Sequence, residues 1–249
     1  MENHELVRIE NVSTGYENKV ILNDISLTIH KNDFIGVIGP NGGGKTTLIR
    51  LILKQIEPFS GTIGYKEGLE KKIGYLPQIN NVDKDFPISV EEVILSGLQS
   101  SKGLFGKYGH KEKEKVYRIM QECGIEHIAR KSIGEISGGQ LQRTFLSRAL
   151  ISEPELLILD EPNTYVDNKF EKELYELLKS LNKDMAILMV THDLGTISSY
   201  VKSIACVNRS LYYHESNIIS QEQLNSYDCP ILLVTHGEVP HTVLNHHKT

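Results

Sequence analysis

Residues 39–47 read Gly39-Pro40-Asn41-Gly42-Gly43-Gly44-Lys45-Thr46-Thr47. This run matches the pattern G-x-x-x-x-G-K-[ST] at every fixed position. The glycines allow backbone N–H groups to approach phosphate oxygens without an intervening Cβ atom. Lys45 can then reach the β- and γ-phosphates as a point charge, and the Thr46 hydroxyl can ligate Mg²⁺. The run therefore predicts a loop that binds the phosphates of a nucleoside triphosphate.

The segments on either side of this loop have the character that the motif needs. Residues 34–38 form a short apolar run, which is typical of a buried strand. Residues 45–52 predict a helix whose N-terminal dipole would face the bound anion. A chance glycine-rich turn is the alternative, but the strand before it and the helix after it favour the phosphate-binding loop.

A second apolar run, Leu156–Leu159, ends in the two carboxylates of Asp160 and Glu161. Consecutive apolar residues suit a parallel strand that is covered on both faces, and ligands of such sheets bind at the carboxyl ends of the strands. We expect Asp160 to lie beside the phosphate-binding loop and to hold Mg²⁺. We expect Glu161 to orient and polarise the attacking water. The alternative, a strand end with solvated acids, is weakened by the phosphate-binding loop in the same chain.

The stretch Ile136-Ser137-Gly138-Gly139-Gln140 precedes an amphipathic helix that we expect over 140–150. Small residues and N–H groups at a helix N-terminus form an anion site. Because the chain already has one phosphate cradle at 39–47, a second one implies that a nucleotide is shared. A capped helix start is the alternative, and it would be preferred if this stretch stood alone.

Together these segments resemble the ATP-binding subunit of an ABC transporter, and the resemblance covers most of residues 5–215. It implies an α/β fold: a P-loop NTPase core with a mainly parallel sheet, an N-terminal antiparallel β subdomain and a helical insertion. Further matches are Tyr16 for stacking on adenine, Gln78 for contact with the transmembrane partner, Asp167 of the D-loop and His192 for the γ-phosphate. Tyr16 and His192 have plainer alternatives, packing for the first and a structural or solvated role for the second.

The resemblance also implies roles for three groups of residues. The catalytic group is Lys45, Gln78, Glu161 and His192. The Mg²⁺ ligands are Thr46, Gln78 and Asp160. The ATP contacts are Tyr16, Gly39, Pro40, Asn41, Gly42, Gly43, Gly44, Lys45, Thr46, Thr47, Ser137, Gly138, Gly139, Gln140 and Asp167. In the family two copies pair head to tail, so Ser137 and Gly139 are expected to act on the ATP of the second copy.

Composition limits the class of protein. The 249 residues carry a net charge of −5, with 24% charged and 39% hydrophobic residues, as in ordinary globular proteins. No apolar run approaches the roughly twenty residues of a membrane helix, and the N-terminus does not read as a signal peptide. The membrane-spanning part is therefore expected on separate permease chains, with this chain at the cytoplasmic face. No basic patch indicates nucleic acid, and three cysteines without paired spacing are expected to be reduced.

The expected organisation is a single ABC ATPase domain over 1–249. Residues 1–78 and 151–225 would form the nucleotide-binding core, 79–150 a helical subdomain with the signature stretch, and 226–249 a C-terminal tail. Side-chain periodicity predicts strands at 6–9 and 25–29, a strand pair within 63–76, and helices at 90–98 and 112–123. A chain with one phosphate-binding loop must pair with a second copy or a relative.

Three segments look like the subgroup that imports zinc, manganese or iron: residues 40–44, 103–105 and the stretch 229–244. We therefore expect an ATPase subunit that powers import of a divalent metal ion, with an extracytoplasmic metal-binding protein in the complex. The alternatives are an exporter or an importer of another substrate. A soluble ATP-dependent clamp on nucleic acid or the ribosome is more distant, because such relatives usually carry two ATPase halves or a long coiled coil.

Histidines gather in the C-terminal tail, where His236, His241, His246 and His247 lie close to Cys229. Histidine and cysteine are suitable ligands for Zn²⁺, so one hypothesis is that the tail senses cytosolic metal. The spacing fits no closed zinc motif, and a polar terminal tail is the default.

Overall fold

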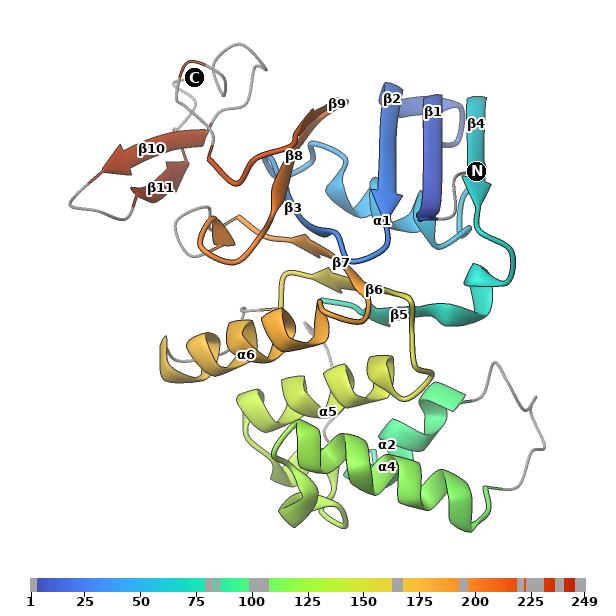
Figure 1. The fold of residues 1–249 in the computed structure, drawn as a ribbon, viewed down its shortest axis with the longest axis vertical. Helices are drawn as coiled ribbons and strands as arrows, with labels where there is room; N and C mark the ends of the chain where they lie inside the picture. The colour runs from blue at the N-terminus through green and yellow to red at the C-terminus, as the bar shows by residue number, and fades with distance from the viewer. Residues whose placement is uncertain are drawn as a thin grey trace. The chain divides into compact units, whose positions relative to one another are not determined.

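The computed structural model describes residues 4–78, 83, 86–98, 108–162, 168–192, 197–218, 222, 231–235 and 240–244, with the backbone alone at 168–170 and in the two C-terminal segments. The chain divides into two compact units, one made of residues 1–67 with 186–249 and the other of residues 68–185. Figure 1 shows their elements, and each unit is described by itself. The expected division into core, helical subdomain and tail stays a prediction.

The first unit begins with an antiparallel sheet in the order β2-β1-β4. Its strands are β1 (Glu5–Tyr16), β2 (Lys19–His30) and β4 (Ser60–Tyr65). Residues 25, 27 and 29 of β2 are buried between less buried neighbours, which is the pattern of a strand with one face on a core. Helix α1 (Lys45–Ile52) packs against β1 and β2. The predicted strands at 6–9 and 25–29 lie inside β1 and β2 and are confirmed.

The same unit contains the strands that carry the phosphate-binding loop. Strand β3 (Phe34–Ile38) pairs in parallel with β7 (Ala186–Val190) and with β8 (Ser203–Asn208), and β9 (Ser210–His214) runs antiparallel to β8. Every residue of β3 and β7 is buried, as expected for parallel strands covered on both faces. The loop follows β3 directly, at the carboxyl end of these strands.

The second unit combines a parallel strand pair with helices. Strand β5 (Ile73–Leu76) pairs with β6 (Leu156–Asp160), so that Leu76 lies opposite Leu159. The helices are α2 (Val90–Leu95), α4 (His110–Glu122), α5 (Gly138–Leu150) and α6 (Asn168–Leu181), with 3₁₀ turns at Leu69–Lys72, Ser96–Leu98, Glu126–Ile128 and Ile133–Glu135. Helix α5 packs against α2, α4 and β5, and in Figure 1 it lies between α4 and α6.

Element boundaries depart from expectation for local reasons. Helix α5 begins two residues before the expected start because Ser137 caps it. Helix α4 runs from His110 to Glu122, so its end lies close to the predicted one but its start comes earlier. The carboxylate of Glu112 accepts the Gly109 N–H at 2.7 Å, which sets that start. The strand pair expected within 63–76 is wrong as a pair: β4 binds β1 and β5 binds β6. Gly68, with φ 76°, starts a 3₁₀ turn that redirects the chain between them.

The C-terminal stretch contains secondary structure that the sequence analysis did not predict. Strands β10 (Ile231–Thr235) and β11 (Pro240–Leu244) form a separate antiparallel sheet with Ile231 opposite Leu244. Cys229, His236, His246 and His247 of the metal-sensing hypothesis lie outside the described residues, and His241 is described by its backbone alone.

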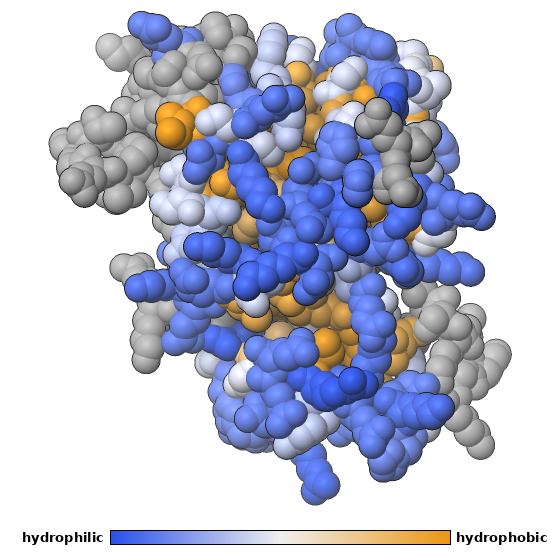
Figure 2. Space-filling model, viewed as in Figure 1, coloured by the Kyte–Doolittle hydropathy of each residue, from blue (hydrophilic) through white to orange (hydrophobic). Residues whose placement is uncertain are grey.

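The described part of the chain includes no helix that is long and apolar enough to cross a membrane. On the face drawn in Figure 2 the surface is mainly hydrophilic. Cys123 and Cys206 are both buried.

Candidate nucleotide-binding and hydrolysis site

Two glycines show why the phosphate-binding loop needs this residue type. Gly39 has φ 149°, and a Cβ there would lie 2.0 Å from the carbonyl oxygen of Val207. Gly44 has φ 108°, and a Cβ there would lie 2.4 Å from a side-chain methyl of Leu22. The loop is therefore held against β8 on one side and β2 on the other, in a backbone conformation that residues with a Cβ rarely adopt.

The loop leads into the N-terminus of α1, which has the features of an anion site. Gly44 is the N-cap, so no side chain caps the first turn, and that turn contains no acidic residue. Lys45 is 7% exposed, and its Nζ donates to the carbonyl oxygens of Gly39 and Pro40 at 2.9 Å each. Thr46 is exposed and Thr47 is buried. The loop and the first turn of α1 fit a polyphosphate, because the first-turn N–H groups and the Lys45 ammonium lie at the same helix end.

Tyr16 stands at the end of β1 with 36% of its surface exposed. Arg50 of α1 donates from Nη1 to the Tyr16 hydroxyl at 3.2 Å, and its guanidinium carbon lies 5.6 Å from the ring centroid. Arg50 was not among the predicted site residues. Its spacing was the available signal, because Thr46 and Arg50 are the exposed positions of α1 and residues four apart share a helix face.

His192 lies at the same edge of the strands as the phosphate-binding loop. The Thr191 N–H donates to the carbonyl oxygen of Val37 at 3.1 Å, so the chain leaving β7 runs beside the end of β3. The next residue, His192, is exposed. The first unit thus brings together Tyr16, residues 39–47 and His192.

The second unit brings three further candidates to one edge of the β5–β6 pair. Asp160 is the last residue of β6 and is 7% exposed, while Gln78 follows the end of β5 by two residues. The Gln78 Nε2 donates to Oε2 of Glu161 at 2.8 Å. Both side chains were predicted at the site, but this bond between them was not.

Glu161 has an unusual backbone. Its φ is 49°, in the left-handed region. That conformation costs a residue with a Cβ about 1–2 kcal/mol. Strain of this kind persists where the surrounding structure fixes the residue, and it gathers at functional positions. Here it sits on the first residue after β6, next to the buried Asp160.

The signature stretch forms the N-terminus of α5. Ser137 Oγ accepts the Gln140 N–H at 3.3 Å, and Gln140 Oε1 accepts the Ser137 N–H at 3.1 Å, which is a capping box. Gly138 and Gly139 occupy the first turn, where an α-helix itself provides no acceptor for the N–H groups. Asp167, the remaining predicted site residue, lies outside the described residues.

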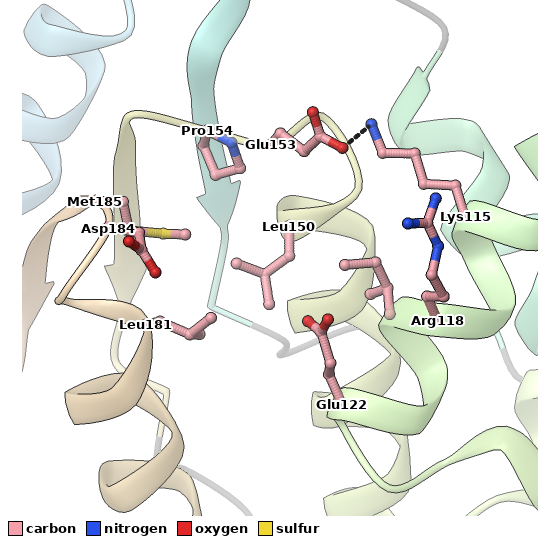
Figure 3. Close-up of a pocket in the computed structure, with 10 residues that line it drawn as sticks. Lys115, Arg118, Glu122, Leu150, Glu153, Pro154, Leu181, Asp184 and Met185 are labelled. Carbon is pink, nitrogen blue, oxygen red and sulfur yellow. Dashed lines mark ion pairs between the residues drawn. The ribbon is translucent and has the colours of Figure 1, made fainter.

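A pocket of about 290 Å³ elsewhere in the second unit does not suit a nucleotide. Its lining includes Leu150 and Leu181, the last residues of α5 and α6, so two helix C-termini lie beside it (Figure 3). Three carboxylates, from Glu122, Glu153 and Asp184, outnumber the two cations of the lining, Lys115 and Arg118. The Nζ of Lys115 forms an ion pair with Oε1 of Glu153 at 2.9 Å. Carboxylates and helix C-termini both repel phosphate, so the N-terminus of α1 suits a polyphosphate better than this pocket does.

Comparison with known proteins agrees with this geometry. The family model described as ABC transporter matches residues 22–164, more than half of the chain. The zinc uptake system ATP-binding protein ZurA of Listeria monocytogenes is 39% identical over 237 residues, which cover 92% of each chain. The zinc import ATP-binding protein ZnuC of Hydrogenovibrio crunogenus is 38% identical over 214 residues, covering 85% of this chain and 82% of that one.

Solved structures share the fold. An inward-facing transporter assigned to the metal-chelate type of ABC transporter is similar with a TM-score of 0.83, 24% identity and 98% coverage of both chains. The chain belongs to the ABC transporter family. Its activity is ATP hydrolysis coupled to transport.

Proposed function

We propose that this chain is the ATPase subunit of an importer of a divalent metal ion, with zinc as the first candidate. The observation that carries the proposal is its similarity to two proteins named for zinc uptake and zinc import, at 39% and 38% identity over most of each chain. The segments at 40–44 and 229–244 support the same subgroup. An exporter or an importer of another substrate remains the alternative that the experiment below separates.

The residues present fit ATP with Mg²⁺. The α1 N-terminus and Lys45 would bind the β- and γ-phosphates, and Tyr16, held by Arg50, would stack on the adenine. The oxygens of Thr46, Gln78 and Asp160 are the hard ligands that Mg²⁺ prefers, and they would hold the ion. Bound Mg²⁺ supplies charge neutralisation on the phosphate oxygens.

In hydrolysis, the Glu161 carboxylate would accept a proton from the attacking water and orient that water towards the γ-phosphorus. Gln78 would position this carboxylate through its bond to Oε2. Lys45 and His192 would stabilise the charge on the transferring phosphoryl group. The substitution Glu161→Gln would preserve the shape of the site but remove the proton acceptor, so ATP would stay bound.

Each chain has one phosphate-binding loop and one signature stretch, so we propose a dimer of two copies. Ser137, Gly138, Gly139 and Gln140 of one copy would complete the ATP site of the other, and Asp167 would contribute to the contact between them. A dimer of this kind closes when ATP is bound and reopens after hydrolysis, which is the motion that transport needs.

The remaining partners follow from this role. Permease subunits on separate chains would span the membrane, and this chain would lie at its cytoplasmic face. Gln78 and the segment 79–150 would pass the closing motion to the permease. An extracytoplasmic metal-binding protein would deliver the ion. A soluble clamp on nucleic acid is disfavoured by the net charge of −5.

The test is metal content in cells that lack the gene, measured by elemental analysis after complementation. The intact chain should restore one of zinc, manganese or iron, and Lys45→Ala should not. Lys179→Ala, which changes an exposed lysine of α6 outside the segment 79–150, is the matched control and should restore the metal. Unchanged content of all three metals in the deletion strain would refute metal import but leave the ATPase activity standing.

A further inference from the structure

One side chain of the signature helix contacts two other helices. Arg143 lies in the second turn of α5, and only 20% of its side chain is exposed. Its Nη1 donates to the carbonyl oxygen of Cys123 at 2.7 Å, and its Nη2 donates to Oε2 of Glu173 at 2.5 Å. Cys123 is the C-cap of α4, and Glu173 lies in the second turn of α6. A single guanidinium therefore joins α5 to α4 and α6.

The contact with α4 is made at the end of that helix. The carbonyl groups of a last helical turn have no intrahelical donor and carry partial negative charge, so a cation that donates to them is stabilising. Gly124 follows the C-cap with φ 68°, and a Cβ there would lie 3.2 Å from Nη1 of Arg143. The close fit of the turn around the guanidinium indicates that this side chain has a specific position at the end of α4.

The contact with α6 links the signature helix to the segment after the D-loop. Helix α6 begins at Asn168, directly after Asp167, and Glu173 is five residues into it. An arginine presents its donors in a rigid planar fork. The two bonds therefore fix the guanidinium relative to α4 and to α6 at the same time. A lysine could not make both bonds with the same geometry.

The position of Arg143 along α5 decides what it can control. It lies three residues beyond Gln140, so it holds the half of the helix that begins with the signature stretch. Arg148, on the same helix, donates from Nε to Ser96 Oγ at 3.0 Å and holds the opposite end. The caps at Ser137 fix the local shape of the first turn, but they do not fix its direction relative to α4 and α6.

We propose that Arg143 is a positioning residue that orients the N-terminal end of α5 against α4 and α6, so that the signature stretch meets the ATP bound by the second copy. The proposal rests on the dimer of the proposed function. It assigns Arg143 to closure of the dimer and not to ATP binding within one copy. Loss of the guanidinium should therefore weaken closure while ATP binding to a single copy is unchanged.

The test uses the full-length chain carrying Glu161→Gln, which retains ATP. Dimer formation is followed by sedimentation velocity as ATP is increased, and ATP binding to the monomer by anisotropy of a fluorescent ATP analogue at low protein concentration. Adding Arg143→Gln should raise the ATP concentration for half-dimerisation by about tenfold, the effect of losing one charge-assisted bond. The analogue's Kd for the monomer should stay within about twofold.

Arg148→Gln is the matched control, because it removes a side-chain hydrogen bond from the other end of the same helix. It should lower the Tm, as Arg143→Gln does, but leave the dimerisation curve in place. Arg143→Lys should recover part of the closure because it keeps the charge. If Arg143→Gln does not fold, Arg143→Lys and Glu173→Gln carry the test, each with a shift of about threefold.

The outcomes separate the two proposals. A background protein that forms no dimer with ATP would overturn the proposed dimer itself and the inference with it. If the background protein dimerises and the Arg143 variants dimerise at the same ATP concentration, the inference alone is overturned. A shift in Arg148→Gln equal to that in Arg143→Gln would also overturn it, because the effect would then be general destabilisation of α5.

Discussion

Helices α1 and α5 both begin at glycines that suit an anion, yet they begin in different ways. The N-cap of α1 is Gly44, which has no side chain to offer its first turn, and a buried lysine follows it. The N-cap of α5 is Ser137, which with Gln140 forms a capping box. Neither first turn contains an acidic residue. The first helix has no side-chain cap and carries a lysine that donates to the loop carbonyls, whereas the second satisfies part of its own terminus.

This difference indicates how the two sites divide the work. In the proposed function the α1 terminus would hold the triphosphate, because donors and a compensating charge are both present. The α5 terminus has donors but no cation in its first turn, so in the proposed dimer it would add contacts to a phosphate that is already held. The four predictions that follow test this division, from the largest expected effect to the smallest.

Replacement of Lys45 should have the largest effect. Lys45→Ala removes the cation of the α1 site and should lower kcat/KM for ATP by about 10²–10³-fold, the range found for loss of one transition-state donor. Phosphate release by the purified chain measures it. Lys113→Ala on α4 should match the unchanged protein. Full activity in Lys45→Ala would mean that the α1 terminus is not the primary phosphate site.

Replacement of Ser137 should have an intermediate effect and a different character. Ser137→Ala removes the N-cap of α5, which typically costs about 1 kcal/mol of stability, and should lower ATPase activity by about tenfold through the second copy. ATP binding to a monomer should not change. Ser137→Thr should restore activity, because threonine also caps helices. Equal losses of monomer binding in the Ser137 and Lys45 variants would erase the distinction between the two helices.

Replacement of Arg50 should have a small effect confined to the α1 side. Arg50→Gln removes the contact that holds Tyr16. An exposed cation–π contact contributes about 0.5–1 kcal/mol, so ATP affinity should fall by about two- to fivefold. Comparison of ATP with GTP sharpens the test, because the loss should depend on the base. An equal loss for inorganic triphosphate would count against the assignment of Tyr16 to the adenine.

The smallest effect concerns two capping boxes of different chemistry. Helix α2 is capped by Ser89 with a carboxylate, Glu92, and hydrogen bonds from Ser89 lower the pKa of that carboxyl group. This contribution to stability is present above the ordinary carboxyl value near 4.5 and is lost as the pH falls through the lowered pKa of the folded state. The Gln140 box of α5 does not titrate.

Thermal unfolding between pH 3 and pH 6 (roughly the range in which carboxyl groups titrate) measures the difference. Glu92→Gln should remove a small part of the acid sensitivity, and Gln140→Glu should add some. An acid response that is identical in all three proteins would show that these caps contribute nothing measurable.

Much of the site could be predicted because its elements are local in sequence. The run 34–52 specifies a strand, a loop and a helix in consecutive residues, and β3 and α1 have the bounds that were expected. Strands β6 and β7 are equally direct, since each is a continuous apolar run. Periodicity and glycine spacing involve residues a few positions apart, so they can be recognised from the sequence alone.

What escaped prediction depends on residues that are far apart in the chain. The bonds of Arg143 reach across 20 and 30 residues, and that between Gln78 and Glu161 reaches across 83. No periodicity encodes such a pair. The error at 63–76 has the same origin. The residues of β4 and β5 do not determine which strand each one pairs with, because the partners β1 and β6 lie far away in the chain. Asp167, the signature's action in a second copy and the metal ligands stay predictions.

The backbone at Glu161 has a consequence for how this protein can change over time. Glycine adopts the left-handed conformation most easily, so Glu161→Gly would relieve strain and remove the carboxylate at the same time. In the proposed mechanism, a substitution that stabilises the fold at this position would therefore also remove the proton acceptor. That mechanism requires selection to keep a locally unfavourable residue there for as long as ATP hydrolysis is needed.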